Sequence, residues 1–238
     1  MEKKKLMQLF LLLLVLSSLT LSAQRNGWGR GGNGSGGCGM NADYIMLLPS
    51  EEISVAERTA LIKMREEEKL ARDVYRQLHD RWGMNVFGNI ANSEQRHMDA
   101  LAVLLKKYEI PDPVGDDLQG VFKDPALSKL YKTLMEKGNL SLKDALIVGA
   151  SIEDLDIFDL HEALLKVDNM DILFVFGNLK KGSENHMRAF SRQLNRLNYQ
   201  YKAQYISQED LDAILAFASG NGGWHGGNGG RRGGRGRG

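Results

Sequence analysis

One short stretch of this sequence has the residue types and the spacing of a metal ligand pair. In "NSEQRHM", residues 92–98, Glu94 and His97 are three residues apart. Residues with this spacing lie on one face of an α-helix, so both side chains can reach the same ion. Carboxylate and imidazole groups suit iron or manganese. The stretch therefore predicts half of a helical metal site.

A second stretch resembles the first but lacks one of its two side chains. In "GSENHM", residues 182–187, His186 again follows a polar segment, and Ser183 stands three residues before it. Glu184 is only two residues before His186, which places it on a different side of a helix. This stretch is expected to contribute a histidine but no carboxylate to the same site.

The elements that would position these residues are helices throughout. Apolar residues recur at intervals of three and four, and no stretch alternates as a strand would. Ser50 is expected to cap the first helix, Gly83 to end it, and Ser141 to start the third long helix. Four long helices are predicted at 51–82, 86–108, 142–166 and 170–199, with short ones at 125–137 and 208–218. A short turn within each pair and a long connection between pairs define an all-α, ferritin-like four-helix bundle, whose long crossover carries a short extra helix.

The apolar face of each long helix contains polar residues at about the same level of the predicted bundle. Bundles that hold two metal ions use a Glu from each of two helices and a Glu-x-x-His from each of the other two. Five of these six positions are filled here, and Ser183 stands at the sixth. Glu67 is an alternative to Glu68, and Asp156 is a candidate substitute for the missing carboxylate. The predicted ligands are Glu68, Glu94, His97, Glu153, Asp156 and His186.

Four motifs carry a resemblance to a known family: "REEEKLARDVYRQL", "FGNIANSEQRHMDAL", "GASIEDLDIFDL" and "GSENHMRAF". Over about residues 50–200 the chain resembles the bacterial ferritin-like family named domain of unknown function 2202, which is distantly similar to rubrerythrin and ferritin. The resemblance implies the same bundle and a metal site on the six residues already named. It implies no particular reaction, because the family is uncharacterised.

The N-terminal segment has the pattern of an export signal. Three lysines precede the apolar run "LMQLFLLLLVL", and small residues follow it. Residues 1–23 are therefore predicted to be a Sec-type signal peptide, which would place the mature protein in the periplasm or outside the cell. An uncleaved anchor is the alternative, but the run is short for a membrane span, so no stable membrane insertion is expected after cleavage. Cys38 is the one cysteine, so no internal disulfide can form.

Composition separates a folded domain, residues 41–218, from two glycine-rich segments, 24–40 and 219–238, which are predicted to be disordered. The whole chain has 31 basic and 30 acidic side chains. Residues 1–23 hold three Lys and one Glu, and the glycine-rich segments hold six Arg. This leaves 22 basic against 29 acidic side chains in the domain, a net charge of −7. Such a domain is not expected to bind nucleic acid specifically.

Two functions fit these observations. The first is an exported metal-binding protein with two iron ions, or manganese, that reacts with peroxide or oxygen as a peroxidase-like or ferroxidase-like oxidoreductase. The second is a metal-free helical scaffold that contacts partners through its tails. A homodimer is compatible with either.

Overall fold

The computed structural model describes residues 40–217, and this part of the chain is helical with no strand. The predicted signal peptide, Cys38 and the predicted C-terminal glycine-rich segment lie outside the described residues. The predicted all-α class is confirmed. The helices are α2 (Ala42–Leu47), α3 (Val55–Trp82), α4 (Asn85–Lys107), α5 (Pro125–Gly138), α6 (Leu142–Leu164), α7 (Met170–Arg196) and α8 (Gln208–Ala216).

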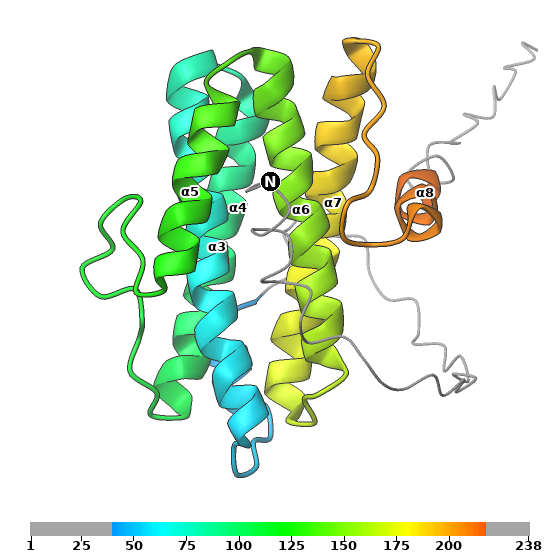
Figure 1. Ribbon diagram of the computed structural model, residues 1–238. Coiled ribbons are helices and arrows are strands. Elements are labelled where there is room, and N and C mark those ends of the chain that lie inside the picture. Colours follow the sequence, from blue (N-terminus) through cyan, green and yellow to red (C-terminus); the bar gives the residue numbers. More distant parts are fainter. Residues whose placement is uncertain (1–39, 218–238) are drawn as a thin grey trace, which may run out of the picture. The chain divides into compact units, whose positions relative to one another are not determined.

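Four long helices form the bundle, as two antiparallel pairs (Figure 1). α3 packs along α4 and α6 packs along α7, while α4 contacts α7 and α3 contacts α6. Gly83 joins the first pair in the left-handed conformation, with φ 65°. The connection between the pairs carries α5, which lies against α3 and α6. The predicted long crossover with a short extra helix is thereby confirmed.

Helix boundaries follow local capping, and here the sequence-based prediction was wrong in places. Ser54, not Ser50, caps α3, and Glu57 completes a capping box by bonding back to Ser54. Ser141 caps α6 as predicted. α6 ends at Leu164 and α7 at Arg196, two and three residues earlier than predicted. The short helix α2 was not predicted.

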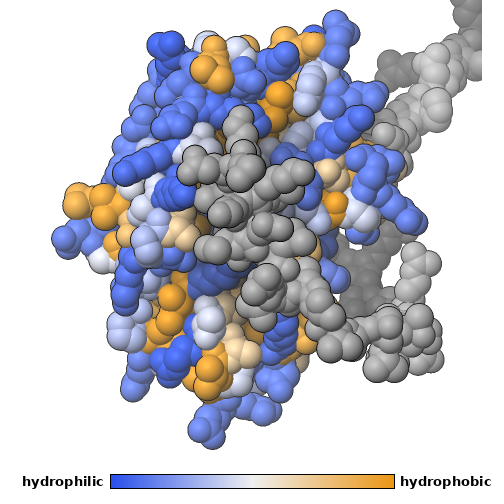
Figure 2. Space-filling view, in the orientation of Figure 1, coloured by the Kyte–Doolittle hydropathy of each residue, from blue (hydrophilic) through white to orange (hydrophobic). Residues whose placement is uncertain are grey.

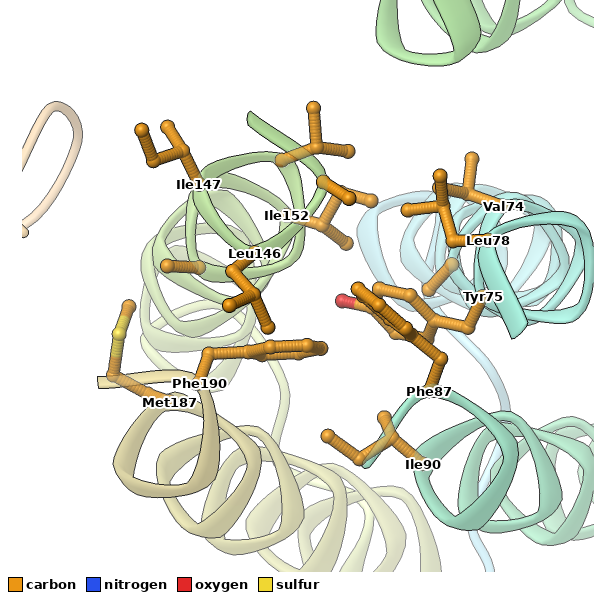
Figure 3. Close-up of a cluster of buried hydrophobic side chains, with 14 of the residues drawn as sticks. Val74, Tyr75, Leu78, Phe87, Ile90, Leu146, Ile147, Ile152, Met187 and Phe190 are labelled. Atoms are coloured by element: carbon orange, nitrogen blue, oxygen red, sulfur yellow. The ribbon is translucent and has the colours of Figure 1, made fainter. Parts of the chain in front are cut away.

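The core consists of two apolar clusters separated by a polar layer. Along α4, Phe87, Ile90 and Ala91 belong to one cluster and Ala100, Leu101, Leu104 and Leu105 to the other. Glu94 and His97 lie between them in the sequence, and both are buried. Figure 3 shows the first cluster, where the rings of Tyr75 and Phe190 meet between the helix pairs with centroids 5.4 Å apart. Both clusters shield the polar layer from water along the bundle axis.

Three basic residues of α3 hold the crossover against the bundle. The Arg65 guanidinium pairs with Asp112 at 2.8 Å, and Lys69 Nζ donates to the carbonyl of Leu118 at 2.7 Å. Arg72 pairs with Asp117. Lys69 and Arg72 are almost wholly buried and share the carboxylate of Asp73, which lies on α3 itself. Spacings of four and three residues put the three cations on one face of α3.

The visible surface of the bundle is mostly hydrophilic, with small separate hydrophobic areas (Figure 2). Among residues 40–217, no helix combines the length and the apolar character needed to cross a membrane.

Candidate metal centre

Five of the six predicted ligands converge in the polar layer. Glu68 comes from α3, Glu94 and His97 from α4, Glu153 from α6 and His186 from α7. The three glutamates are at most 2% exposed, and the two histidines are buried. Carboxylates buried to this extent need partners, because an unpaired charge in an apolar interior is strongly unfavourable. The polar layer thus buries three carboxyl and two imidazole groups, each of which needs a partner of opposite charge or a metal ion.

The first three residues form a compact group between α3 and α4. His97 Nδ1 lies 3.0 Å from Glu68 Oε2 and 2.7 Å from Glu94 Oε2. Glu68, Glu94 and His97 each offer one ligand atom, and these atoms lie within 4.8 Å of one another. We call this set the first triad.

The second group forms between α4, α6 and α7. His186 Nδ1 lies 2.8 Å from Glu94 Oε1 and 3.4 Å from Glu153 Oε2. Glu94, Glu153 and His186 meet the same 4.8 Å criterion, and we call them the second triad. Glu94 belongs to both triads, and it points one oxygen to each histidine. A carboxylate in this position can bridge two metal ions.

The spacing of these atoms is compatible with coordination of metal ions. Neighbouring ligands about 2.1 Å from an octahedral metal ion are about 3.0 Å apart, and the four contacts span a similar range. Both oxygens of Glu94, Oε1 of Glu68 and Nδ1 of His186 are buried without a hydrogen-bond partner of good geometry. Such groups normally have partners in native proteins. The donor set and its unpartnered atoms fit a pair of cations.

In the metal-free protein the five groups set one another's charge. Burial raises the pKa of Glu68 to about 8 and also raises that of Glu153. Burial would raise the pKa of Glu94 too, but His186 and His97 outweigh it and hold that pKa below its usual range. Burial would lower the histidine pKa values, yet the glutamates raise that of His97 well above normal and that of His186 to about 10. The metal-free centre thus keeps two imidazolium ions and a protonated Glu68 at neutral pH.

The structure separates the two glutamates that the sequence left as alternatives. Glu68 is 1% exposed and belongs to the first triad. Glu67 lies outside both triads, and Lys63 Nζ is 3.4 Å from its Oε1. Glu184 of the second stretch also points away from the centre and pairs with Lys180 at 2.8 Å.

Asp156 lies beside Ser183 and outside both triads. The Ser183 hydroxyl is 2.5 Å from Asp156 Oδ2 and 3.1 Å from the carbonyl of Leu179. The pair fills the sixth position with a hydrogen bond from α7 to α6, and Asp156 is therefore a neighbour of the triads in this structure.

Two further residues shape the centre. The Tyr75 hydroxyl donates to Glu153 Oε1 at 2.5 Å and thereby orients that carboxylate. Gly182 lies against the His97 ring, so that a Cβ built there would be 2.6 Å from Cε1. Tyr75 is seven residues after Glu68, about two helical turns, and this spacing is the signal in the sequence that both lie on one face of α3. The role of Gly182 was missed, although its position next to Ser183 was a signal.

The fold and the site together define a class: an all-α bundle with two buried Glu/Glu/His triads that share one carboxylate. Residues 57–218 match the model of the family described as "Uncharacterized protein domain (DUF2202)", and the chain belongs to this family. It is 55% identical over 180 residues to the uncharacterized protein MJ0754 of Methanocaldococcus jannaschii, covering 76% of this chain and 97% of that protein.

The crystal structure of the same relative, described as a hypothetical protein, has a similar fold. It superimposes with a TM-score of 0.70 at 57% identity, over 71% of this chain and 97% of that chain. These descriptions name no reaction, no metal and no kinship with rubrerythrin or ferritin, and they do not restrict the family to bacteria. The similarity therefore shows the family and the fold.

Proposed function

We propose that the centre binds two metal ions, iron or manganese, with one ion in each triad and Glu94 as the bridge between them. The observation that carries this proposal is the position of Glu94, whose two oxygens face the two histidines at 2.7 and 2.8 Å. Glu68 and His97 would complete one site, and Glu153 and His186 the other. The predicted likeness to rubrerythrin and ferritin supports the same arrangement.

The proposed activity is oxidoreductase chemistry with peroxide or oxygen, or the oxidation of Fe(II) as substrate. When bound, redox-active ions would supply electrons to an oxidant and polarise it. The chain's own residues hold that pair in place. Tyr75 fixes the Glu153 carboxylate through its hydroxyl, Glu94 is fixed between two histidines, and the apolar clusters on either side exclude water.

A metal-free scaffold is the rival function, and the unpartnered atoms of the centre argue against it. Oε1 of Glu68 and both oxygens of Glu94 are buried without a well-aligned hydrogen-bond donor, and a buried oxygen without a donor destabilises a fold that holds no metal. We also propose, from the N-terminal segment, that the protein acts in the periplasm or outside the cell.

Metal analysis tests this function directly. The chain is expressed in iron-supplemented medium, purified without chelator, and its metal content measured by mass spectrometry. We expect about two ions per chain in the wild type and a large loss for His97→Ala and Glu94→Gln. Glu184→Gln is the matched control, because Glu184 lies on α7 near His186 but faces Lys180.

The same measurement can refute the proposal. A wild-type chain with far less than one ion, unchanged by His97→Ala, would show that the layer is a polar core without metal. Metal that is lost equally from Glu184→Gln would show that surface carboxylates hold it.

A further inference from the structure

A small cavity lies where α3, α5 and α6 meet. Its volume is about 50 Å³, which is room for a few water molecules or for one small organic molecule. Leu70 on α3 and three leucines of the crossover helix form much of its wall. The three are Leu127, Leu130 and Leu134. The cavity is partly open, so a molecule from solvent can enter it.

Two carboxyl groups are the main polar features of this cavity. Glu67 and Asp156 both line it, and Oε2 of Glu67 is buried without a hydrogen-bond partner. A buried oxygen without a partner can accept a hydrogen bond from a ligand. The cavity thus offers an apolar wall and an unused polar atom.

The cavity is next to the metal centre. Asp156 belongs to the cavity wall, and its Oδ2 is 2.5 Å from the hydroxyl of Ser183, which stands at the sixth position of the centre. Glu67 directly precedes Glu68, and Ile152 of the wall directly precedes Glu153. Asp156 therefore belongs both to the cavity wall and to the hydrogen-bonded pair at the sixth position of the centre.

The size and the walls decide which molecules fit. Leucine side chains cannot replace the hydration shell of an ion, so charged oxidants and hydrated cations are excluded. A molecule of two to five heavy atoms with an apolar part and an O–H group would match the leucines and the free oxygen of Glu67.

We propose that this cavity is the entrance through which a small uncharged oxidant, a short-chain alkyl hydroperoxide, reaches the metal centre beside Asp156. The role rests on the proposed function: reduction of a hydroperoxide ROOH to the alcohol ROH and water takes two electrons, which two bound Fe(II) ions would supply on becoming Fe(III), and two protons, which would come from water. Binding in the cavity, in contrast, depends only on the walls described above.

Xenon tests the cavity without any metal or turnover. Crystals of the protein are pressurised with xenon, which binds in apolar cavities of this kind. We expect xenon between Leu127, Leu130 and Leu134, and we expect Leu127→Trp to abolish it because the larger ring fills the space. Leu118→Trp is the control, because Leu118 is in the crossover but 59% exposed and outside the wall. A wild-type cavity that takes up no xenon overturns the proposal.

Oxidation kinetics test the entrance role. The protein, loaded anaerobically with Fe(II), is mixed with ethyl hydroperoxide or with hexacyanoferrate(III), a charged oxidant too large for the cavity. Leu127→Trp should slow the hydroperoxide reaction about tenfold, equal to about 1.4 kcal/mol of barrier, and leave the hexacyanoferrate rate and the metal content unchanged. Leu127→Phe, a milder filling, repeats the test if the tryptophan variant melts early.

The outcomes separate the two proposals. An unchanged hydroperoxide rate in a variant that has lost xenon shows that the cavity is a packing defect and overturns the entrance role. A wild type that takes up no iron refutes the proposed function and the oxidant role together, while xenon still decides whether the cavity binds small apolar molecules.

Discussion

Metal binding to this centre should release about three protons per chain at pH 7. The pKa of His186 is raised to about 10 and that of His97 lies well above 6.5, so both are protonated in the metal-free protein. Burial raises the pKa of Glu68 to about 8, so about nine-tenths of it is protonated at pH 7. All three must lose their protons to act as ligands.

The sign of the pH dependence follows from the same values. Protons compete with metal ions when the pH is below the pKa values of the ligands, about 8 for Glu68 and about 10 for His186. The apparent affinity for metal should therefore rise with pH, by about tenfold per pH unit for each proton released. Between pH 6 and pH 7 the release of three protons should therefore raise the apparent affinity for metal about a thousandfold. The metal-free protein would therefore load poorly in mildly acidic solution.

The assay is calorimetric titration of the metal-free protein with Mn(II) in two buffers of different ionisation enthalpy, which gives the proton count. His186→Ala should release one proton fewer than the wild type. Glu184→Gln, outside the centre, should match the wild type. Release of less than one proton by a wild-type chain that binds two ions would refute the assignment of these three groups as ligands.

Three further predictions concern single residues of the centre. Glu68→Gln should stabilise the metal-free protein at high pH, because the raised pKa of Glu68 makes its favourable contribution complete below pH 4.5 and lost as pH rises through about 8. The gain, up to a few kcal/mol, is measured by urea unfolding in the presence of chelator, and a stability difference that does not change with pH would contradict the prediction. Gly182→Ala should displace the His97 ring, because the added Cβ would lie 2.6 Å from Cε1 of that ring; the metal content should fall while the helical circular dichroism signal is unchanged. Gly177→Ala is the control, because no atom lies within 4 Å of a Cβ at position 177, and equal metal content in the two variants would disprove the contact. Tyr75→Phe should leave the metal content near normal but lower the unfolding free energy by roughly 1–3 kcal/mol, because it removes the donor to the buried Oε1 of Glu153. Unchanged thermal stability would show that this hydrogen bond contributes nothing.

The sequence predicted the centre better than it predicted the ends of its helices. Helical periodicity placed Glu94, His97, Glu153 and His186 on the buried faces of their helices, and Glu68 with Glu67 as its alternative, because a buried face of a long helix repeats reliably every three to four residues. The structure brings all five together.

Features that depend on packing between distant segments could not be predicted. Whether Asp156 or Glu67 entered the centre depended on small rotations of α6 and α3, which periodicity does not resolve. The start of α3 was open to a better prediction, since Ser54 and Glu57 form a capping box and Ser50 has no acid three residues later. The short helix α2 carries too few turns for a periodic signal.

The basic residues that hold the crossover also bear on how two copies of the chain could exchange parts. In a bundle of two hairpins, the long connection is the hinge about which one hairpin could swing out and complete a neighbouring copy. Here the buried side chains of Arg65, Lys69 and Arg72 anchor residues 112–118 of that connection to α3. The anchored part stays with its own α3, which shortens the segment that could swing. It thereby favours closure of the centre within one chain, where Glu94 meets Glu153 of the same molecule.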